Sequence, residues 1–250
     1  MPLPPFPLPR SREDVARELR SHLSEVSRLR LAAEANADGA AVREALRRWQ
    51  SARLASAYPD LLGSPRFGAA ARFFLDDLYG PKNFTRRDAE ITKIVPALTR
   101  MLPAPALAVI ARALELDALS EQLDAAMSTL LGPGRIDAQR YAAAYRSAGT
   151  RALRERQIAL IVEVGSGLNE LVRLPLLGTT LAMMRGPAAL TGLAALHDFL
   201  ERGFRAFRQM GDASEFLATI QSRESSLLER LYAGDPEPFG QWARDASHTA

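Results

Sequence analysis

The chain has no cysteine, and aromatic residues make up only 7% of its 250 positions. Without cysteine, the protein has no disulfide bond, no thiolate metal site and no cysteine nucleophile. It also lacks alternating runs of valine, isoleucine and threonine joined by Asn-Gly turns, so nothing in it predicts a β-sheet. The first residues, MPLPPFPLPR, carry no early positive charge and no continuous apolar core, and we expect no signal peptide there.

The rest of the composition is typical of a soluble, globular helical protein. The chain is 47% hydrophobic and 24% charged, with abundant alanine, leucine and arginine, which favour helix. Apolar residues recur at three- and four-residue spacing between short breaks that contain glycine and proline. We therefore predict an all-α fold, a multi-helix globular bundle of about ten helices with an N-terminal helical hairpin.

Changes in composition divide the chain into four parts. Residues 1–10 predict an extended proline-rich arm, and residues 11–62 predict the helical hairpin. Residues 63–235 form the expected all-α globular body, followed by a loose C-terminal tail over 236–250 in which Phe239 and Trp242 are able to dock. The hairpin either packs on the body or serves for self-association.

Several helix boundaries carry recognisable signals. Ser64 followed by Pro65 predicts a helix start, and Asp137 and Thr150 are candidate N-cap residues. The segment Leu174–Leu196 contains a single charged residue, Arg185, and is long enough for a membrane span. Because glycine and proline interrupt this segment, we predict instead two buried helices, one over residues 176–185 and one from Ala188, and no membrane span.

The stretch ARFFLDDLYGPKNFTRRDAEI, residues 71–91, contains two adjacent carboxylates. On a helix, successive side chains lie about 100° apart, so Asp76 and Asp77 diverge and make a poor acid–base pair. Phe74 belongs to the inward face of this helix and Phe73 to the adjacent one. We therefore interpret the stretch as structural.

The same stretch resembles the uncharacterised bacterial proteins named for a FFLEELY motif, with aspartate in place of both glutamates. The resemblance continues through Gly80-Pro81-Lys82 and Arg86-Arg87-Asp88. It implies no established activity, cofactor or catalytic residue. The motif residues, which we take as structural, are Phe73, Phe74, Asp76, Asp77, Tyr79, Lys82 and Asp88.

The first hypothesis is a non-enzymatic binding protein in the cytoplasm. It binds either a protein partner or an apolar small ligand, because the region around Leu174–Phe207 is unusually apolar and contains methionine. No known nucleotide loop or serine-nucleophile elbow is present, and Gly165-Ser166-Gly167 favours close helix packing instead. The candidate ligand-binding residues are Leu177, Met183, Met184, Leu193, His197, Glu201 and Phe204.

Two alternatives stay open. His197 lies within or beside an apolar helical stripe with Glu201 one turn away, which permits a haem-type cofactor protein or enzyme with His197 as axial ligand. No Glu-x-x-His pair is present, so no di-iron site is predicted. The second alternative is a regulator that docks nucleic acid or an anionic surface through the arginine-rich stretch Arg135–Arg156. The net charge of only +3 makes nucleic-acid binding the weaker interpretation.

Overall fold

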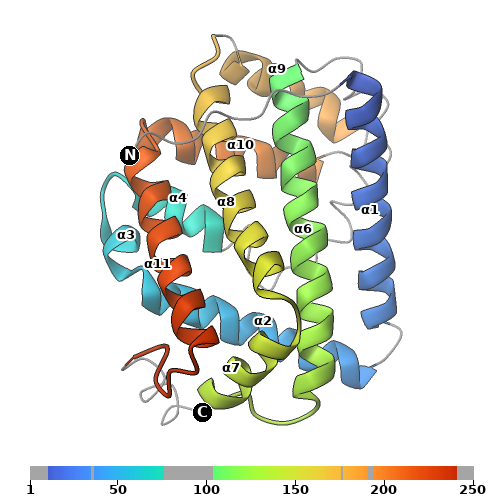
Figure 1. The fold of residues 1–250 in the computed structure, drawn as a ribbon. Helices are drawn as coiled ribbons and strands as arrows, with labels where there is room; N and C mark the ends of the chain where they lie inside the picture. The colour runs from blue at the N-terminus through green and yellow to red at the C-terminus, as the bar shows by residue number, and fades with distance from the viewer. Residues whose placement is uncertain (1–10, 35–36, 76–103, 176, 191–193, 241–250) are drawn as a thin grey trace.

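The computed structural model describes residues 11–34, 37–75, 104–175, 177–190 and 194–240. These residues form helices and no strand, which confirms the all-α prediction (Figure 1). The helices are α1 (Arg12–Glu34), α2 (Ala37–Ala57), α3 (Pro59–Gly63), α4 (Gly68–Phe73), α6 (Ala104–Leu131), α7 (Ala138–Ser147), α8 (Arg151–Leu171), α9 (Leu177–Leu190), α10 (Ala194–Met210) and α11 (Ser214–Tyr232).

Helix α6 lies at the centre of the bundle. Figure 1 shows α1 along one side of α6 and α8 along the other, with α11 beyond α8. Helices α2 and α7 also pack against α6. The buried residues of α6 are spread around the whole helix rather than along one stripe, as expected for a helix with neighbours on several sides.

The N-terminal hairpin packs on this body. The apolar stripe of α1 faces α6, and its period of three and four residues explains why one face of α1 is buried along much of its length. Hairpin helices α1 and α2 also contact each other. The buried residues between α1 and α6 are Val15, Leu19, Leu23, Leu107, Ala111 and Leu114.

A buried ionic cluster joins the hairpin to α6 near its middle. Glu121 accepts hydrogen bonds from Arg30 of α1 at 3.0 Å, from Arg47 of α2 at 2.8 Å, and from Arg43. Arg30 also donates to Asp117 at 2.8 Å. Burial alone would raise the pKa of Glu121, but the three arginine charges outweigh it and hold that pKa below its ordinary value.

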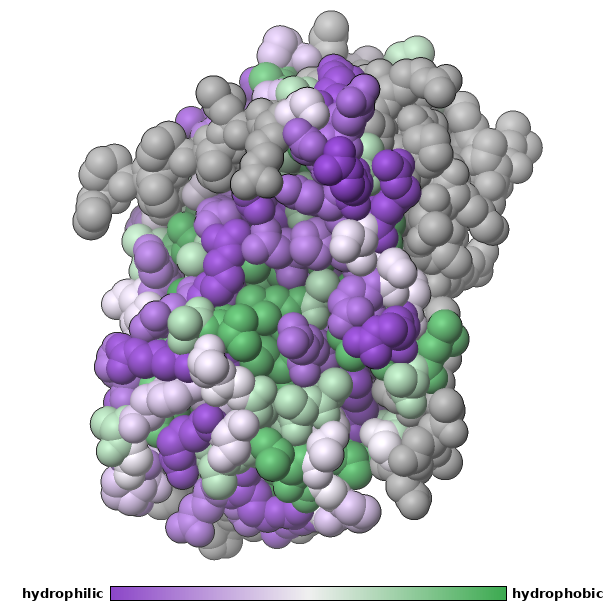
Figure 2. All heavy atoms as spheres, turned by 45° about the vertical axis from the view of Figure 1, so that its right-hand side comes forward, coloured by the Kyte–Doolittle hydropathy of each residue, from purple (hydrophilic) through white to green (hydrophobic). Residues whose placement is uncertain are grey.

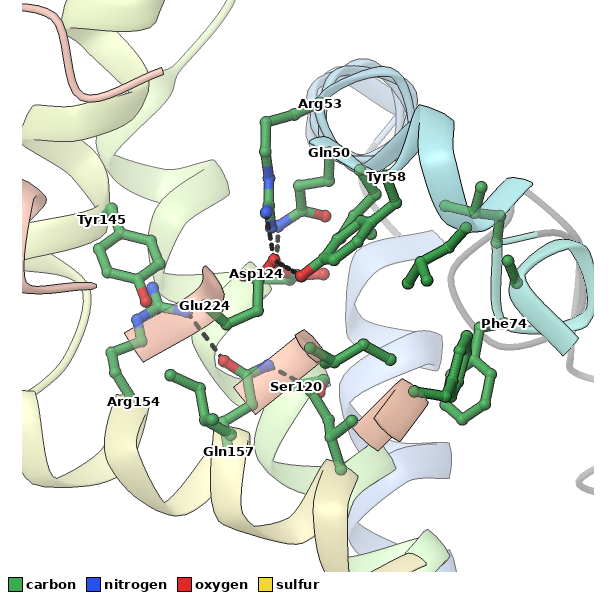
Figure 3. A pocket seen from close by; sticks show the side chains of 18 of the residues that line it. Gln50, Arg53, Tyr58, Phe74, Ser120, Asp124, Tyr145, Arg154, Gln157 and Glu224 are labelled. Carbon is green, nitrogen blue, oxygen red and sulfur yellow. Dashed lines mark hydrogen bonds and ion pairs between the residues drawn. The ribbon is translucent and has the colours of Figure 1, made fainter. Parts of the chain in front are cut away.

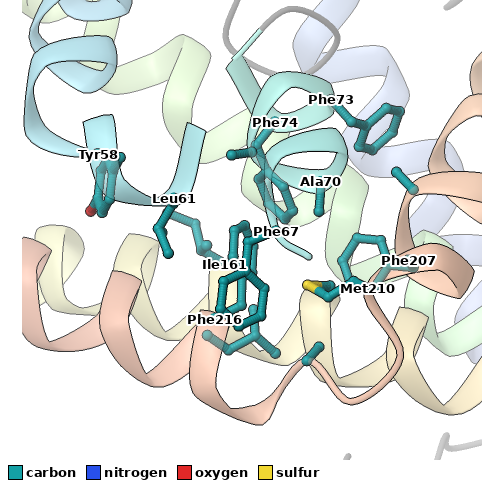
Figure 4. Close-up of a cluster of buried hydrophobic side chains, with 14 residues drawn as sticks. Tyr58, Leu61, Phe67, Ala70, Phe73, Phe74, Ile161, Phe207, Met210 and Phe216 are labelled. Atoms are coloured by element: carbon teal, nitrogen blue, oxygen red, sulfur yellow. The ribbon is translucent and has the colours of Figure 1, made fainter. Parts of the chain in front are cut away.

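The largest apolar cluster surrounds α4 and contains many of the protein's phenylalanines (Figure 4). Phe74 contacts the rings of Phe207 and Phe216, with centroids 6.0 Å and 5.7 Å away. Phe73 packs on Gly203 of α10, where an added Cβ would lie 2.8 Å from the Phe73 ring. Glycine at position 203 therefore lets α4 approach α10 closely.

The predicted caps of α7 and α8 are confirmed. The Asp137 carboxylate accepts from the Arg140 backbone N–H at 2.8 Å, and the Thr150 hydroxyl accepts from the Leu153 N–H at 3.3 Å. Ser64 accepts in the same way from the Phe67 N–H at 3.2 Å, but the helix assigned there begins only at Gly68. A short helix that we did not predict, α3, precedes it, with Pro59 at its first position.

The prediction of two helices split at Gly186-Pro187 is wrong, because α9 continues through both residues to Leu190. Pro187 lies in the last turn of α9, where its missing N–H removes one backbone hydrogen bond near the end of the helix. Among the described residues, no helix combines the length and the apolar character that crossing a membrane requires.

Two further contacts fix the body. Gly165 of α8 faces Leu217 of α11, and an added Cβ would overlap the Leu217 side chain, which confirms the close packing expected of Gly165-Ser166-Gly167. Phe239 packs edge-on against Trp49, with centroids 5.2 Å apart. The start of the predicted loose tail is therefore held to α2, whereas Trp242 lies outside the described residues.

We predict that Gly165→Val destabilises the protein by about 2 kcal/mol, because Leu217 is fully buried and overpacked side chains have no space to move into. Urea denaturation measures this loss. Gly186→Val is the matched control, since nothing lies within 4 Å of a Cβ added at Gly186. Equal stability of the two variants would contradict the close α8–α11 contact.

We predict that Glu121→Gln costs about 3–5 kcal/mol of unfolding free energy, because two buried arginines and the partly buried Arg47 lose their shared anion. The lowered pKa makes this stabilisation fully present above the ordinary glutamate value of 4.5 and lost as the pH falls below it. Chemical unfolding at several pH values should show a shallower acid dependence in the variant. The control Glu44→Gln, which breaks an exposed pair with Arg48, should change stability by less than about 1 kcal/mol.

Candidate functional site

A cavity of about 130 Å³ lies inside the bundle, between the hairpin, α4, α6, α7, α8 and α11 (Figure 3). Each of these elements contributes side chains to its wall, so the cavity is a product of the whole fold. The residues that line it are Gln50, Arg53, Leu54, Tyr58, Leu61, Ala71, Phe74, Leu75, Ser120, Asp124, Tyr141, Tyr145, Arg154, Gln157, Ile158, Ile161, Phe216, Ile220 and Glu224.

Glu224 of α11 organises one wall of the cavity. Its Oε1 atom accepts from Arg53 Nη1 at 2.6 Å and from the Tyr58 hydroxyl at 2.7 Å. Burial would lower the pKa of Arg53, but the facing carboxylate outweighs burial and raises that pKa above its ordinary value. Arg53 and Glu224 thus form an ion pair in this wall.

A second polar contact follows between α2 and α6. Gln50 of α2 donates from Nε2 to Asp124 Oδ1 of α6 at 2.9 Å. Burial raises the pKa of Asp124 above its ordinary value, and the nearby negative charge of Glu121 raises it further. The hydrogen bond from Gln50 and the positive charges of Arg43 and Arg154 lower this pKa, but they do not cancel the rise. Asp124 is thus easier to protonate than an exposed aspartate.

Arg154 is a buried arginine in the cavity wall whose donors are only partly paired. Only 2% of its surface is exposed, and its guanidinium carbon lies 3.9 Å from the ring centre of Tyr145. Nη1 makes a long hydrogen bond of 3.4 Å to Gln157 Oε1. Within the described part of the chain, Nε and Nη2 have no hydrogen-bond partner. Buried arginine N–H groups without acceptors are unfavourable, so these two donors require an acceptor in the cavity.

The opposite side of the cavity is apolar. Figure 3 shows Phe74 on the far side from Arg154 and Tyr145, and Phe74 also belongs to the main apolar cluster with Ile161 and Phe216. A cavity with a charged end and an apolar end suits a ligand that has the same two parts.

Three tyrosines line the polar side, and burial raises the pKa of each. The shift is upward for Tyr58, Tyr141 and Tyr145, with desolvation of the phenolate as its main cause. Tyr141 is further enclosed by Trp49, whose ring stacks on it with centroids 3.8 Å apart. The three phenols are therefore neutral hydrogen-bonding groups over the physiological range.

Our sequence reasoning missed this cavity, because its polar residues are far apart in the chain. Arg53 and Glu224 are separated by 171 positions, and no short motif connects them. One signal was present: Arg154 shares an i, i+4, i+7 stripe on α8 with Ile158 and Ile161. An arginine on an otherwise apolar stripe indicates a buried charge that needs a partner.

The structure describes two of the motif residues, and both lie in the apolar core. Phe73 and Phe74 are buried, 6% and 7% exposed, in the core around α4. The remaining motif residues lie outside the described residues: Asp76, Asp77, Tyr79, Lys82 and Asp88. The structural role expected of these five residues therefore stays a prediction.

The candidate ligand residues whose side chains the structure describes do not line this cavity. Met183 is 75% exposed on α9, so it lies on the surface rather than in an enclosed core. Leu177 and Phe204 are partly buried, and the side chains of Met184 and Leu193 lie outside the described set. We expected the helices of residues 174–196 to be buried. That expectation is wrong for α9 at Met183, because the side chain of Met183 faces solvent.

His197 is buried, and a backbone carbonyl engages its ring. Its Nε2 lies 2.8 Å from the Leu181 carbonyl of α9, rather than against Glu201. Glu201 instead pairs with Arg185 and Arg205, and hydrogen bonds from Arg185 and Arg205 hold the pKa of Glu201 down to about 2. Nε2 is therefore already engaged by a carbonyl, which disfavours His197 as an axial ligand.

His197 and Glu201 also lie near Asp198, and their potential ligand atoms are all within 4.8 Å of one another. The Asp198 side chain is 61% exposed, and two arginines already neutralise Glu201. A cation at this position would have to displace those arginines. The three residues are therefore a weak metal site.

The arginine-rich stretch is mostly used inside the molecule. Arg146 donates to the Leu231 carbonyl at 3.2 Å, and Arg156 pairs with Glu115 at 2.8 Å and with Glu163 at 2.6 Å. Arg151 pairs with Glu155 and Glu229. Arg154 points into the cavity. These pairings leave little of the predicted basic surface for a nucleic acid to contact.

We predict that Tyr58, Tyr141 and Tyr145 stay protonated in the folded protein at about pH 11, one unit above the ordinary tyrosine value of about 10. Because their pKa values are raised, the stabilisation they give is present below about pH 10 and is lost as the pH rises. At that pH the native protein should show less tyrosinate absorbance than the urea-unfolded protein, because these three phenols stay protonated. Tyr145→Phe should reduce the difference by one tyrosine; an unchanged difference would show that Tyr145 is not protected.

Comparison with known proteins gives the chain a family but no activity. No curated protein and no solved structure matches it. One family model, described as a domain of unknown function (DUF8198), matches residues 29–238, which include every residue that lines the cavity. The chain therefore belongs to the DUF8198 family.

Proposed function

We propose that the protein binds a small ligand in the cavity between the hairpin, α4, α6, α7, α8 and α11. The observation that carries this proposal is Arg154, a buried arginine that lines the cavity with two N–H donors lacking acceptors among the described residues. Buried arginine donors are satisfied by protein acceptors, by ordered water or by a ligand, and Arg154 has two of them at the wall of a cavity. A ligand that enters the cavity supplies the missing acceptor.

The size and lining of the cavity fit this role. A cavity of about 130 Å³ is similar to the dry cavity of about 150 Å³ that admits benzene in an engineered protein. The surrounding walls are mainly helical side chains, and the apolar part includes Ile161 and Phe216 from the core. The ligand is therefore a compact molecule of about six to eight non-hydrogen atoms.

The proposed function is still that of a helical binding protein without an assigned chemistry. The proposed ligand site is now the cavity, rather than the region of α9 and α10 expected from the sequence. The partly buried Asp124, whose pKa is raised, would also suit a general acid, so an enzyme that uses Asp124 rather than His197 is the alternative. The resemblance to FFLEELY-motif proteins and a cytoplasmic location stay predictions.

Partner binding is the other expected role. Figure 2 shows apolar side chains gathered near the middle of one face, with hydrophilic side chains above them. The large apolar side chains that are most exposed belong to several different helices, and none of them identifies an occupant. They are Leu31, Leu130, Leu153, Leu174, Met183 and Leu200. Binding of a partner, including a second copy through the hairpin, therefore stays a prediction.

We predict that Ala71→Leu blocks the cavity, because Ala71 lines it and the larger side chain takes up ligand space. Calorimetric titration with benzene and with 3-methylbutan-1-ol should show binding to the unchanged protein and none to this variant. Ala52→Leu is the matched control, since Ala52 is exposed on α2 and lies outside the cavity wall.

Thermal unfolding separates blocking from misfolding. The variant Ala71→Leu should unfold at a temperature similar to that of the unchanged protein, because it fills space rather than removing it. If the unchanged protein binds neither of these probes nor a carboxylate of similar size, or if Ala71→Leu binds both probes as well as Ala52→Leu does, the cavity is not a ligand site.

A further inference from the structure

The wall of the cavity also indicates the chemical class of the ligand, a step that rests on the proposed function. We infer that the ligand is a compact monocarboxylate, with its carboxylate on Arg154 and its apolar body toward Phe74 and Ile161. Three features of the wall support this assignment: its geometry, its charges and the positions of its donors.

The geometry selects a planar anion. Arginine presents its N–H groups in a fixed planar fork, and Nε with one Nη is an edge that binds both oxygens of a carboxylate. The two unpartnered donors of Arg154 are Nε and Nη2, whereas Nη1 contacts Gln157. Arg154 Cζ lies over the Tyr145 ring, 3.9 Å from its centre, and this contact holds the guanidinium at the cavity wall.

The charges favour an anion over a cation. Two arginines and two carboxylates line the cavity, and Arg53 is already paired with Glu224. Arg154 and Asp124 remain, and Asp124 is hydrogen-bonded to a neutral amide, Gln50. Asp124 Oδ1 is thus engaged by that amide, whereas Nε and Nη2 of Arg154 have no acceptor among the described residues, so the donors left open in the wall belong to a cation.

The remaining polar groups suit a carboxylate as well. The neutral hydroxyls of Tyr141 and Tyr145 are O–H donors on the same side as Arg154, and burial keeps them protonated. Phosphate and sulfate esters are also anions, but the cavity of about 130 Å³ leaves little room for a tetrahedral group together with an apolar body. A branched or short-chain monocarboxylate fits both ends.

The test compares three probes of nearly equal size by calorimetric titration of the full chain: 3-methylbutanoate, 3-methylbutan-1-ol and 3-methylbutylamine. We expect the carboxylate to bind about tenfold or more tightly than the alcohol, because a charge-assisted pair replaces a neutral hydrogen bond. The amine should bind most weakly, since it brings a positive charge to Arg154. This comparison needs no variant, so it does not depend on whether a variant folds.

Variants then locate the preference. Arg154→Met should lose the preference for the carboxylate, so that it binds 3-methylbutanoate no more tightly than 3-methylbutan-1-ol. Arg151→Met is the matched control: it changes an arginine of the same helix that pairs with Glu155 and Glu229 outside the cavity, and it should keep that preference. Thermal unfolding of each variant verifies that it is folded before titration.

The outcomes distinguish the two proposals. If the alcohol binds and the carboxylate binds no better, the cavity is a ligand site but the carboxylate inference is wrong. If the preference survives in Arg154→Met, the anion is bound elsewhere and the inference is also wrong. If none of the three probes binds, the cavity holds only water and the proposed function fails together with the inference.

Discussion

The fold depends on one buried carboxylate that is shared by two helices of the hairpin. Glu121 is 6% exposed on α6, and it binds Arg30 from α1 together with Arg43 and Arg47 from α2. A charge in this position is costly to bury unless its partners are held in place, so the three arginines restrict how the hairpin can sit. Apolar packing between α1 and α6 would permit sliding by a turn, whereas this cluster permits a single register.

The same register builds the cavity. Arg43, Arg47 and Gln50 follow one another along the face of α2 that meets α6, and their partners Glu121 and Asp124 are one turn apart on α6. The polar side of the cavity therefore continues the buried ionic cluster, with the next turn of α2 contributing Arg53 to Glu224. If the hairpin moved on α6, the ionic cluster and the cavity wall would be lost together.

Features that depend on neighbours in the chain were predictable, whereas features that depend on distant residues were not. Caps such as Asp137 and Thr150 act within three residues, and the close contact of Gly165 follows from a lack of side chain. Helix α9 was split wrongly at Pro187, because sequence alone does not show that a single lost hydrogen bond near a helix end is tolerated. The partners of His197 and Arg154 come from other helices or from the cavity, so spacing could not reveal them.

The residues covered by the family match include both the ionic cluster and the cavity that depends on it. The match begins at residue 29, one position before Arg30, and ends at residue 238, after the last residue that lines the cavity, Glu224. It thus contains both the ionic cluster and the cavity, while the apolar contact of Val15, Leu19 and Leu23 with α6 lies before it on the α1 side. The matched segment therefore contains both the wall of the cavity and the ionic cluster that positions α2 on α6. The first turns of α1, which precede the segment, add apolar contact with α6 to a register that Glu121 already sets.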